Sequence, residues 1–234
     1  MRKFIAFSVA SFLGLSALTS VAQINQGTKF IGGNVGYNSS TSTYTYNNPS
    51  LSPQDRETKF TRQEFSITPQ VGVFIADNLA MGASIGFTNG KNTNPYYSGS
   101  ATDTYSVVAK LNSFLIAPFV RYYYLPVENF GFYGQLSAGY SLDRARLEYN
   151  TLTPFSEKTT GSGAFANITP ALVFFPTNKL GLELTCGSLG YSRTKSETTS
   201  SQSSSTLTEQ KQSYFGANFG LSSLTLGASY YLGR

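Results

Sequence analysis

The stretch ITPQVGVFI, residues Ile67–Ile75, decides the fold because two further versions of it follow along the chain. The second is IAPFVRYYY at Ile116–Tyr124, and the third is ITPALVFF at Ile168–Phe175. Aligned on their prolines, all three carry apolar residues two positions before, two after and four after the proline, and each runs into a short turn. A strand and a tight turn that return about every 50 residues predict a series of similar β-hairpins laid side by side.

The residues of the first copy alternate strictly between two faces. The apolar face holds Phe65, Ile67, Pro69, Val71, Val73 and Ile75, and the other face holds Glu64, Ser66, Thr68, Gln70 and Gly72. An apolar face of this length matches the 9–11 residues, roughly, that a tilted strand needs to cross a bilayer. Proline donates no ladder hydrogen bond, so we interpret three prolines at one depth as bends or bulges within strands.

The N-terminus has the pattern of a secretory signal. Arg2 and Lys3 precede an apolar run, and small residues precede Gln23. We therefore predict a signal peptide over residues 1–22 and one β-barrel domain over residues 23–234. No later apolar run approaches the ~20 residues of a transmembrane helix.

Composition favours one all-β domain. The chain has 22 Gly, 16 Tyr and 18 Phe, and only 12% of its residues are charged. The formal charge of +5 falls to +3 once Arg2 and Lys3 are removed with the signal, which gives no argument for nucleic acid binding. The single cysteine, Cys186, excludes an internal disulfide.

The alternation predicts eight strands in an antiparallel up-and-down transmembrane β-barrel. Three short turns alternate with four long polar loops, and both chain ends lie on the side of the short turns. The predicted loops cover residues 38–59, 88–103, 150–163 and 193–212. In the last strand the parity of the apolar residues changes at Ser222–Ser223, where a β-bulge would restore a single apolar face.

The chain resembles the small eight-stranded outer-membrane barrels, the group of OmpA transmembrane domains and OmpX. In detail it is similar to the outer membrane protein β-barrel domain family that is common in Bacteroidetes. The likeness is carried by the proline strands, above all Ala117–Tyr123, and by the terminal stretch Leu226–Leu232. The resemblance covers the whole mature chain and implies the fold and an outer-membrane location with several spans, but no particular activity.

The sequence contains no histidine. The enzymes among outer-membrane barrels resemble one another in their need for a histidine base, and zinc sites most often use this residue. The carboxylates of the loops lack the spacing of a calcium loop. We therefore expect no catalytic residues, no cofactor and no metal.

Four charged residues on the predicted inward face are candidates for ion pairs in the lumen: Glu64, Arg121, Asp143 and Glu183. The interior of an eight-stranded barrel is only wide enough for side chains, so inward charges must find partners or water. Arg121 and Glu183 both lie near the short turns and can pair across the lumen. Such a pair is either a structural plug or a gate for a narrow pore.

These observations predict an outer-membrane barrel with a filled lumen and a structural or surface-interaction role. A narrow porin-like channel for ions or small solutes is the alternative, whereas a soluble lipocalin-like barrel would need its apolar face inside. Expected partners are outer-membrane lipids and lipopolysaccharide, the latter near Arg144 and Arg146, and the barrel-assembly machinery during biogenesis. The long loops either bind an extracellular ligand or are only solvated. We expect a monomer.

Overall fold

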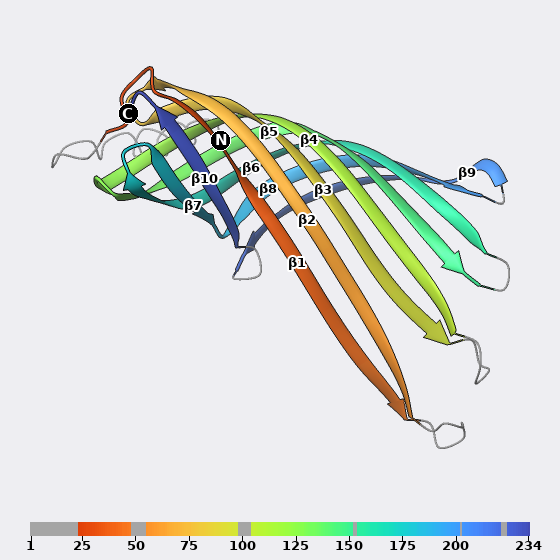
Figure 1. Cartoon of the computed structure of the whole chain (residues 1–234). Helices are drawn as coiled ribbons and strands as arrows, with labels where there is room; N and C mark the ends of the chain where they lie inside the picture. Colours follow the sequence, from red (N-terminus) through yellow and green to blue (C-terminus); the bar gives the residue numbers. More distant parts are fainter. Residues whose placement is uncertain (1–22, 48–54, 98–103, 152–153, 202, 221–223) are drawn as a thin grey trace, which may run out of the picture.

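The computed structural model describes residues 23–47, 55–97, 104–151, 154–201, 203–220 and 224–234, which form an antiparallel all-β fold (Figure 1). The strands are β1 (Lys29–Asn47), β2 (Asp55–Ala76), β3 (Leu79–Tyr97), β4 (Thr104–Val127), β5 (Phe130–Asn150), β6 (Phe155–Thr177), β7 (Leu180–Thr185), β8 (Gly187–Ser200), β9 (Ser203–Phe219) and β10 (Thr225–Leu232). Within these ranges, no helix is long and apolar enough to cross a membrane. The predicted signal peptide over residues 1–22 lies outside the described residues.

Eight strands form a closed ring near the short turns. Each strand from β1 to β6 pairs with the next, β6 pairs with β7, β7 with β10, and β10 returns to β1. All of these pairs are antiparallel. Most connect strands that are neighbours along the chain, and the exceptions are β7–β10 and β10–β1. The predicted fold class, an antiparallel up-and-down barrel of eight strands, is therefore confirmed.

Ten strands are found because two of the predicted eight are interrupted. The seventh predicted strand breaks at Cys186 into β7 and β8, and both parts pair with β6. The last one breaks after Phe219 into β9, which pairs with β8, and β10, which pairs with β7 and β1. The bulge predicted at Ser222–Ser223 lies outside the described residues.

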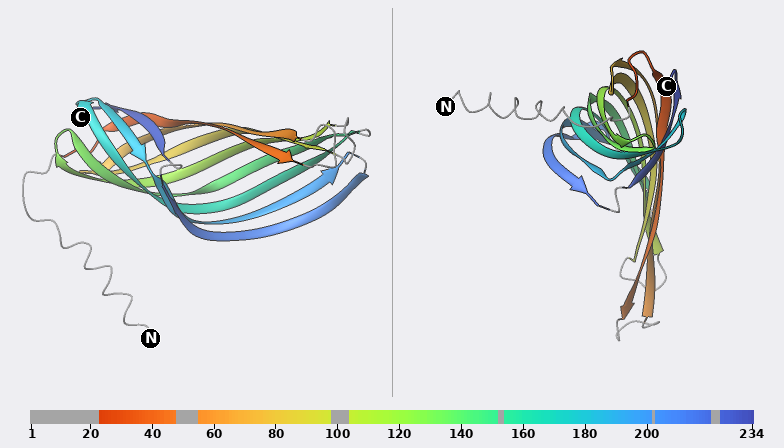
Figure 2. Two further views of the ribbon diagram at one scale, coloured as in Figure 1. Left: turned by 90° about the horizontal axis from the view of Figure 1, so that it is seen from below. Right: turned by 90° about the vertical axis from the view of Figure 1, so that its left-hand side faces the viewer.

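The predicted long loops are largely strands. β1 and β2 stay paired as far as Asn47 and Asp55, and β8 and β9 as far as Ser200 and Ser203. Ser- and Thr-rich sequences satisfy their backbone groups in these ladders, so their polarity does not prevent strand formation. Above the ring the sheet opens between β1 and β9 (Figure 2), because in the described part of the chain β1 beyond Val35 pairs only with β2, and β9 pairs only with β8.

Each repeated proline lies inside a strand where one ladder is interrupted. The β2–β3 register passes from Ile67 to Gln70 across Pro69, and the β4–β5 register from Ile116 to Phe119 across Pro118. Pro170 lies between the β6 residues that pair with β8 and those that pair with β7. The missing N–H of proline explains why the ladder is lost on one side only.

The core fills the interior of the ring at its short-turn end. The buried apolar side chains pack as one cluster: Ile24, Phe30, Phe74, Ala80, Phe119, Tyr123, Leu125, Tyr133, Ala171, Val173, Phe175 and Tyr231. Gly72 and Gly82 face this cluster. A Cβ at Gly72 would lie within about 2.6 Å of the Phe30 ring, and one at Gly82 would lie as close to the Phe119 ring, so both positions need glycine. The aromatic residues therefore form a floor across the barrel.

Candidate functional site

Arg121, on β4, is fully enclosed in the lumen with only 1% of its surface exposed. Its Nη1 donates to Glu183 Oε1 at 3.1 Å and to the Tyr123 hydroxyl at 2.8 Å. Its Nε and Nη2 donate to Gln135 Oε1 at 2.9 and 2.6 Å, and Nη2 also donates to Gln70 Oε1 at 2.9 Å. A guanidinium carries five N–H groups, so these five hydrogen bonds satisfy it completely.

Glu183, on β7, completes the network from the opposite wall. Besides Arg121, its carboxylate accepts hydrogen bonds from the Tyr133 hydroxyl at 2.7 Å and from the Ser229 hydroxyl at 2.5 Å. The Arg121 guanidinium also lies 4.1 Å from the centre of the Tyr133 ring, a cation–π distance. Both charges of this buried ion pair therefore have several further partners, as burial of an ion pair requires.

The chain's N-terminal segment closes the short-turn end beneath this network. The Ile24 side chain is buried, its N–H donates to Asn78 Oδ1 at 2.9 Å, and the Asn78 N–H donates back to the Ile24 carbonyl at 3.0 Å. The Gly27 N–H donates to the Phe74 carbonyl at 2.8 Å. Asn78 has a φ of 63°, a left-handed conformation that Asn tolerates better than most residues. The lumen is thus closed by the aromatic floor and by the segment that contains Ile24 and Gly27.

A polar cavity of about 160 Å³ lies beside Arg121, on the side away from the aromatic floor. It is lined by Asn34, Thr68, Gln70, Ser84, Leu115, Ala117, Arg121, Tyr133, Gln135, Ser137, Phe165, Asn167, Thr169 and Thr185. Two buried polar atoms of its lining, Gln70 Nε2 and Asn167 Oδ1, have no hydrogen-bond partner. A cavity of this polarity and size suits a few ordered water molecules.

The structure brings together two of the four residues singled out in the sequence. Arg121 and Glu183 form the buried ion pair, whereas Glu64 pairs with the exposed Arg62 at 3.1 Å. Asp143 lies further along β5 and accepts hydrogen bonds from Ser113 and Ser141. Glu64 and Asp143 are therefore separate from the central network.

Sequence reasoning missed the neutral partners of the pair, which are Gln70, Tyr123, Gln135, Tyr133 and Ser229. All five lie on inward faces, which alternation alone reveals. Their contact with the pair depends on cross-strand register, such as Arg121 opposite Gln135. Counting back from the short turns between strands would have found that register.

The network has no group that is free to act as a nucleophile or a base. Every polar atom of the Arg121 side chain is already hydrogen-bonded, and Glu183 is held by three donors. Among the described residues, no cluster of three or more His, Cys, Asp and Glu side chains is placed to hold a metal ion. The arrangement is suited to fixing the strands and filling the lumen.

No protein-family model and no curated protein matches the sequence. Solved structures with a similar course of the chain include Ail, the attachment invasion locus protein of Yersinia pestis, in complex with the heparin analogue sucrose octasulfate, with 14% identity over 88% of this chain and 99% of that one at a TM-score of 0.35. A major outer membrane protein from Thermus thermophilus is 12% identical over 88% of this chain and 99% of that one, at a TM-score of 0.42. The ferric yersiniabactin uptake receptor FyuA from Yersinia pestis is 12% identical over 89% of this chain, which covers 33% of the receptor, at a TM-score of 0.40. At these scores the likenesses carry no argument about function.

Proposed function

We propose that the chain is an integral β-barrel protein of the bacterial outer membrane, with a sealed lumen and a structural or surface-interaction role. The observation that carries this proposal is the reversed polarity of the ring. Large apolar side chains point outward and stay exposed, and Leu226, for example, has 70% of its surface exposed. The charged pair Arg121–Glu183, in contrast, is buried inside. A soluble protein rarely exposes a contiguous apolar surface of this extent, whereas a barrel in lipid requires one.

The exposed apolar side chains surround the ring completely. Every strand of the ring contributes to this surface, the apolar belt: Ile31, Val35, Ile67, Val71, Ile75, Met81, Ile85, Ile116, Val120, Tyr122, Tyr124, Phe130, Phe132, Leu136, Ile168, Leu172, Phe174, Leu182, Leu226, Tyr230 and Leu232. Where β1 to β7 and β10 pair as a closed ring, the described residues leave no unpaired strand edge, which a lipid environment demands.

The strands are about twice as long as a membrane requires. β2, β4 and β6 contain 22, 24 and 23 residues, whereas a tilted strand crosses the hydrocarbon in about 9–11 residues. The polar halves therefore project beyond the membrane as paired hairpins, a surface that supports the interaction role. The finer relationship to the OmpA and OmpX group and to the Bacteroidetes family remains part of this proposal, as do the monomeric state and the use of the barrel-assembly machinery.

The location is tested by fractionation and by heat-modifiability on a gel. Protein extracted from the outer-membrane fraction in detergent should migrate differently before and after boiling, because a folded barrel binds less dodecyl sulfate. Recovery from the soluble periplasm with no shift would contradict the proposal.

A narrow channel is the alternative role, and the polar cavity above Arg121 is the observation that favours it. The buried pair and the aromatic floor favour a closed lumen. Planar-bilayer recordings of wild type and Arg121→Ala distinguish the two. Silence in both supports the plug, whereas steady wild-type conductance that changes in Arg121→Ala would establish a channel.

The surface-interaction role is tested by shortening the hairpin that projects from the ring along β8 and β9. Deletion of residues 196–210 leaves the ring strands β7 and β10 intact, so the heat-modifiable shift should persist. Loss of binding to host or neighbouring cell surfaces in the deletion variant would support the role. Unchanged cell-surface binding would remove this hairpin as its carrier.

A further inference from the structure

Four basic side chains stand in one cross-strand row on the outer wall of the barrel. Lys91 of β3 is opposite Lys110 of β4, Lys110 is opposite Arg146 of β5, and Arg146 is opposite Lys158 of β6. These four residues, the basic row, share the outward face of their strands with the apolar belt. Adjacent strands are about 4.8 Å apart, and like charges directly opposite each other are destabilising. A bound anion would therefore relieve like-charge repulsion along the row.

Among the described residues, one carboxylate pairs with this row. Lys110 Nζ donates to both oxygens of Glu148 at 2.9 Å, and Arg146 Nε lies 3.6 Å from Glu148 Oε1. The hydrogen bond from Lys110 and the charges of the neighbouring cations hold the pKa of the Glu148 carboxyl below its ordinary value. Within the ranges that the structure describes, no carboxylate lies within salt-bridge distance of Lys91 or Lys158.

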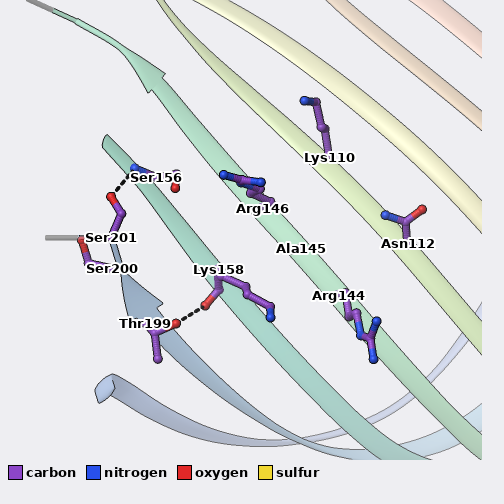
Figure 3. Close-up of a pocket in the computed structure, with 10 residues that line it drawn as sticks. All are labelled: Lys110, Asn112, Arg144, Ala145, Arg146, Ser156, Lys158, Thr199, Ser200 and Ser201. Carbon is purple, nitrogen blue, oxygen red and sulfur yellow. Dashed lines mark hydrogen bonds between the residues drawn. The ribbon is translucent and has the colours of Figure 1, made fainter. Parts of the chain in front are cut away.

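A shallow depression of about 400 Å³ lies against the row, and Figure 3 shows three of its cations around it. Arg144 lines the same depression from two residues nearer the ring on β5. Hydroxyl-bearing residues line its far side, where the Thr199 hydroxyl donates to the Lys158 carbonyl at 3.4 Å and the Ser156 N–H donates to Ser201 Oγ at 2.9 Å. With Arg144, five cationic side chains against one carboxylate leave a formal charge of +4 on this surface.

On β3, β4 and β5 the row lies just beyond the apolar surface. The last apolar positions of these three strands are Phe87, Phe114 and Leu142, four residues nearer the short turns, whereas the position in register on β6 is Ser162. Four residues span about 13 Å along a strand, or about 9 Å of height at a tilt of about 45°. Long Lys and Arg side chains can reach toward the membrane over part of this distance.

On β3 to β6 the outward positions next to the row on its short-turn side are Asn89, Asn112, Arg144 and Thr160, and none of them is acidic. On the neighbouring β8, Glu197 is opposite Thr160 and pairs with Lys195. Glu148, in contrast, lies one row further from the ring. The positive charge is therefore least compensated in the direction of the lipid surface.

We propose that the basic row, together with Arg144, binds the phosphate groups of an anionic lipid headgroup in the outer leaflet. The inference rests on the proposed membrane location, and the continuity of the row with the apolar belt favours a lipid over a soluble anion. Four strands in register span about 14 Å between the outermost cations, which leaves room for two phosphates. The preferred ligand is a glycolipid headgroup that carries two phosphates, because paired phosphates use the whole row and charge-assisted hydrogen bonds add up along it.

The test compares two double variants that each remove two cations from adjacent strands. Arg146→Gln/Lys158→Gln removes two members of the row. Lys195→Gln/Lys211→Gln is the matched control, because Lys195 and Lys211 are also directly opposite each other, but Glu197 and Glu209 lie within 3.5 Å of their ammonium groups. Native mass spectrometry of the protein in neutral detergent would titrate three lipids: a bisphosphorylated glucosamine disaccharide lipid, phosphatidylglycerol and phosphatidylcholine.

We expect wild type to bind the bisphosphorylated lipid at least about tenfold more tightly than phosphatidylcholine, with the row variant losing about tenfold and the control changing by less than about twofold. Equal effects in both variants, or none in the row variant, would overturn the proposal. Glu148→Gln provides a gain-of-function arm, because removal of the carboxylate that pairs with the row should tighten lipid binding several-fold, which a folding defect cannot do. Should the double variant not fold, Glu148→Gln and Lys158→Gln decide the question by their opposite expected effects.

Two further measurements distinguish this proposal from a structural role of the row and from a site for soluble phosphates. The row variant should be more resistant to urea than wild type in neutral detergent, because it removes like-charge repulsion, and lower resistance would indicate a structural role instead. Inorganic pyrophosphate that competes as strongly as the lipid would identify a site for soluble phosphates and would overturn the lipid assignment. Because the titration is made in detergent, a failure to insert into vesicles would contradict the proposed function while leaving the binding result interpretable.

Discussion

Replacement of Arg121 by Met tests the energetic role of the lumen network most directly. Met has a similar length without charge, so the change removes five hydrogen bonds while it largely preserves the volume. Glu183 stays buried with its charge and keeps only the hydroxyl donors of Tyr133 and Ser229. Removal of one partner from a buried ion pair costs about 3–5 kcal/mol, and we expect Arg121→Met to reduce the free energy of unfolding by this amount.

A double-mutant cycle shows whether the pair is the cause. Glu183→Gln alone leaves Arg121 as an uncompensated buried cation and should cost a similar amount, whereas Arg121→Met/Glu183→Gln leaves no buried charge in the pair. The double variant should therefore be about 2–3 kcal/mol more stable than the sum of the single effects predicts.

Urea unfolding in neutral lipid vesicles, followed by tyrosine fluorescence and by the gel shift, measures these free energies. Arg62→Met is the control for the chemical change, because Arg62 pairs with Glu64 at 3.1 Å on the exposed part of β2 and should lose no more than about 1 kcal/mol. Additive single effects, or a cost for Arg121→Met as small as that of Arg62→Met, would refute the assignment of the pair as a structural plug.

Three other changes test the ends of the barrel and the basic row. Ile24→Ala should destabilise the barrel by about 2–5 kcal/mol in the same urea assay, because the side chain is fully buried. Asn78→Gly should cost about 1 kcal/mol, because the hydrogen bond from the Ile24 N–H is lost. Asn78→Ala should cost about 1–2 kcal/mol more than Asn78→Gly, because alanine tolerates the positive φ of residue 78 less well than glycine does. Gly72→Leu should lower the urea midpoint, because even its Cβ would overlap the aromatic floor, and an unchanged midpoint would show that the floor is loosely packed. Lys110→Gln should raise the pKa of Glu148 toward 4.5 in a carboxyl NMR titration. Because the pKa of Glu148 is depressed in the folded state, the stability that the Lys110–Glu148 pair supplies is present above pH 4.5 and is lost as the pH falls through the folded-state pKa.

Alternation alone predicted the ring because the outward positions of its strands are mostly apolar. Ile31 and Leu226 show the principle: both are apolar, both lie on outward positions, and both stay exposed. The expected contact between Arg121 and Glu183 also follows from sequence, since both are inward charges placed a few residues from short turns. A charge at that depth has few alternatives to an opposite charge across the lumen.

The remaining features depend on interactions that a single strand does not encode. The polar segments on either side of residues 48–54 read as loops because they lack apolar residues, yet their backbone groups pair with each other as far as Asn47 and Asp55. The break at Cys186 arises where β6 changes partner from β8 to β7. Likewise, the basic row exists only after four strands are placed in register, because its members are separated by up to 67 positions along the chain, from Lys91 to Lys158.

The number of strands explains why the lumen has little room for a ligand. A ring of eight strands leaves little interior space beyond its own side chains. Here the inward charges of Arg121 and Glu183 are hydrogen-bonded to each other and to neutral side chains of the lumen. The outward charges behave oppositely, because Lys91 and Lys158 have no carboxylate within salt-bridge distance among the described residues. In the proposed membrane location, an anion would reach these cations most readily along the membrane surface. Neutralising the lumen pair should therefore change stability without changing lipid selectivity, and neutralising the basic row should change lipid selectivity without opening the lumen.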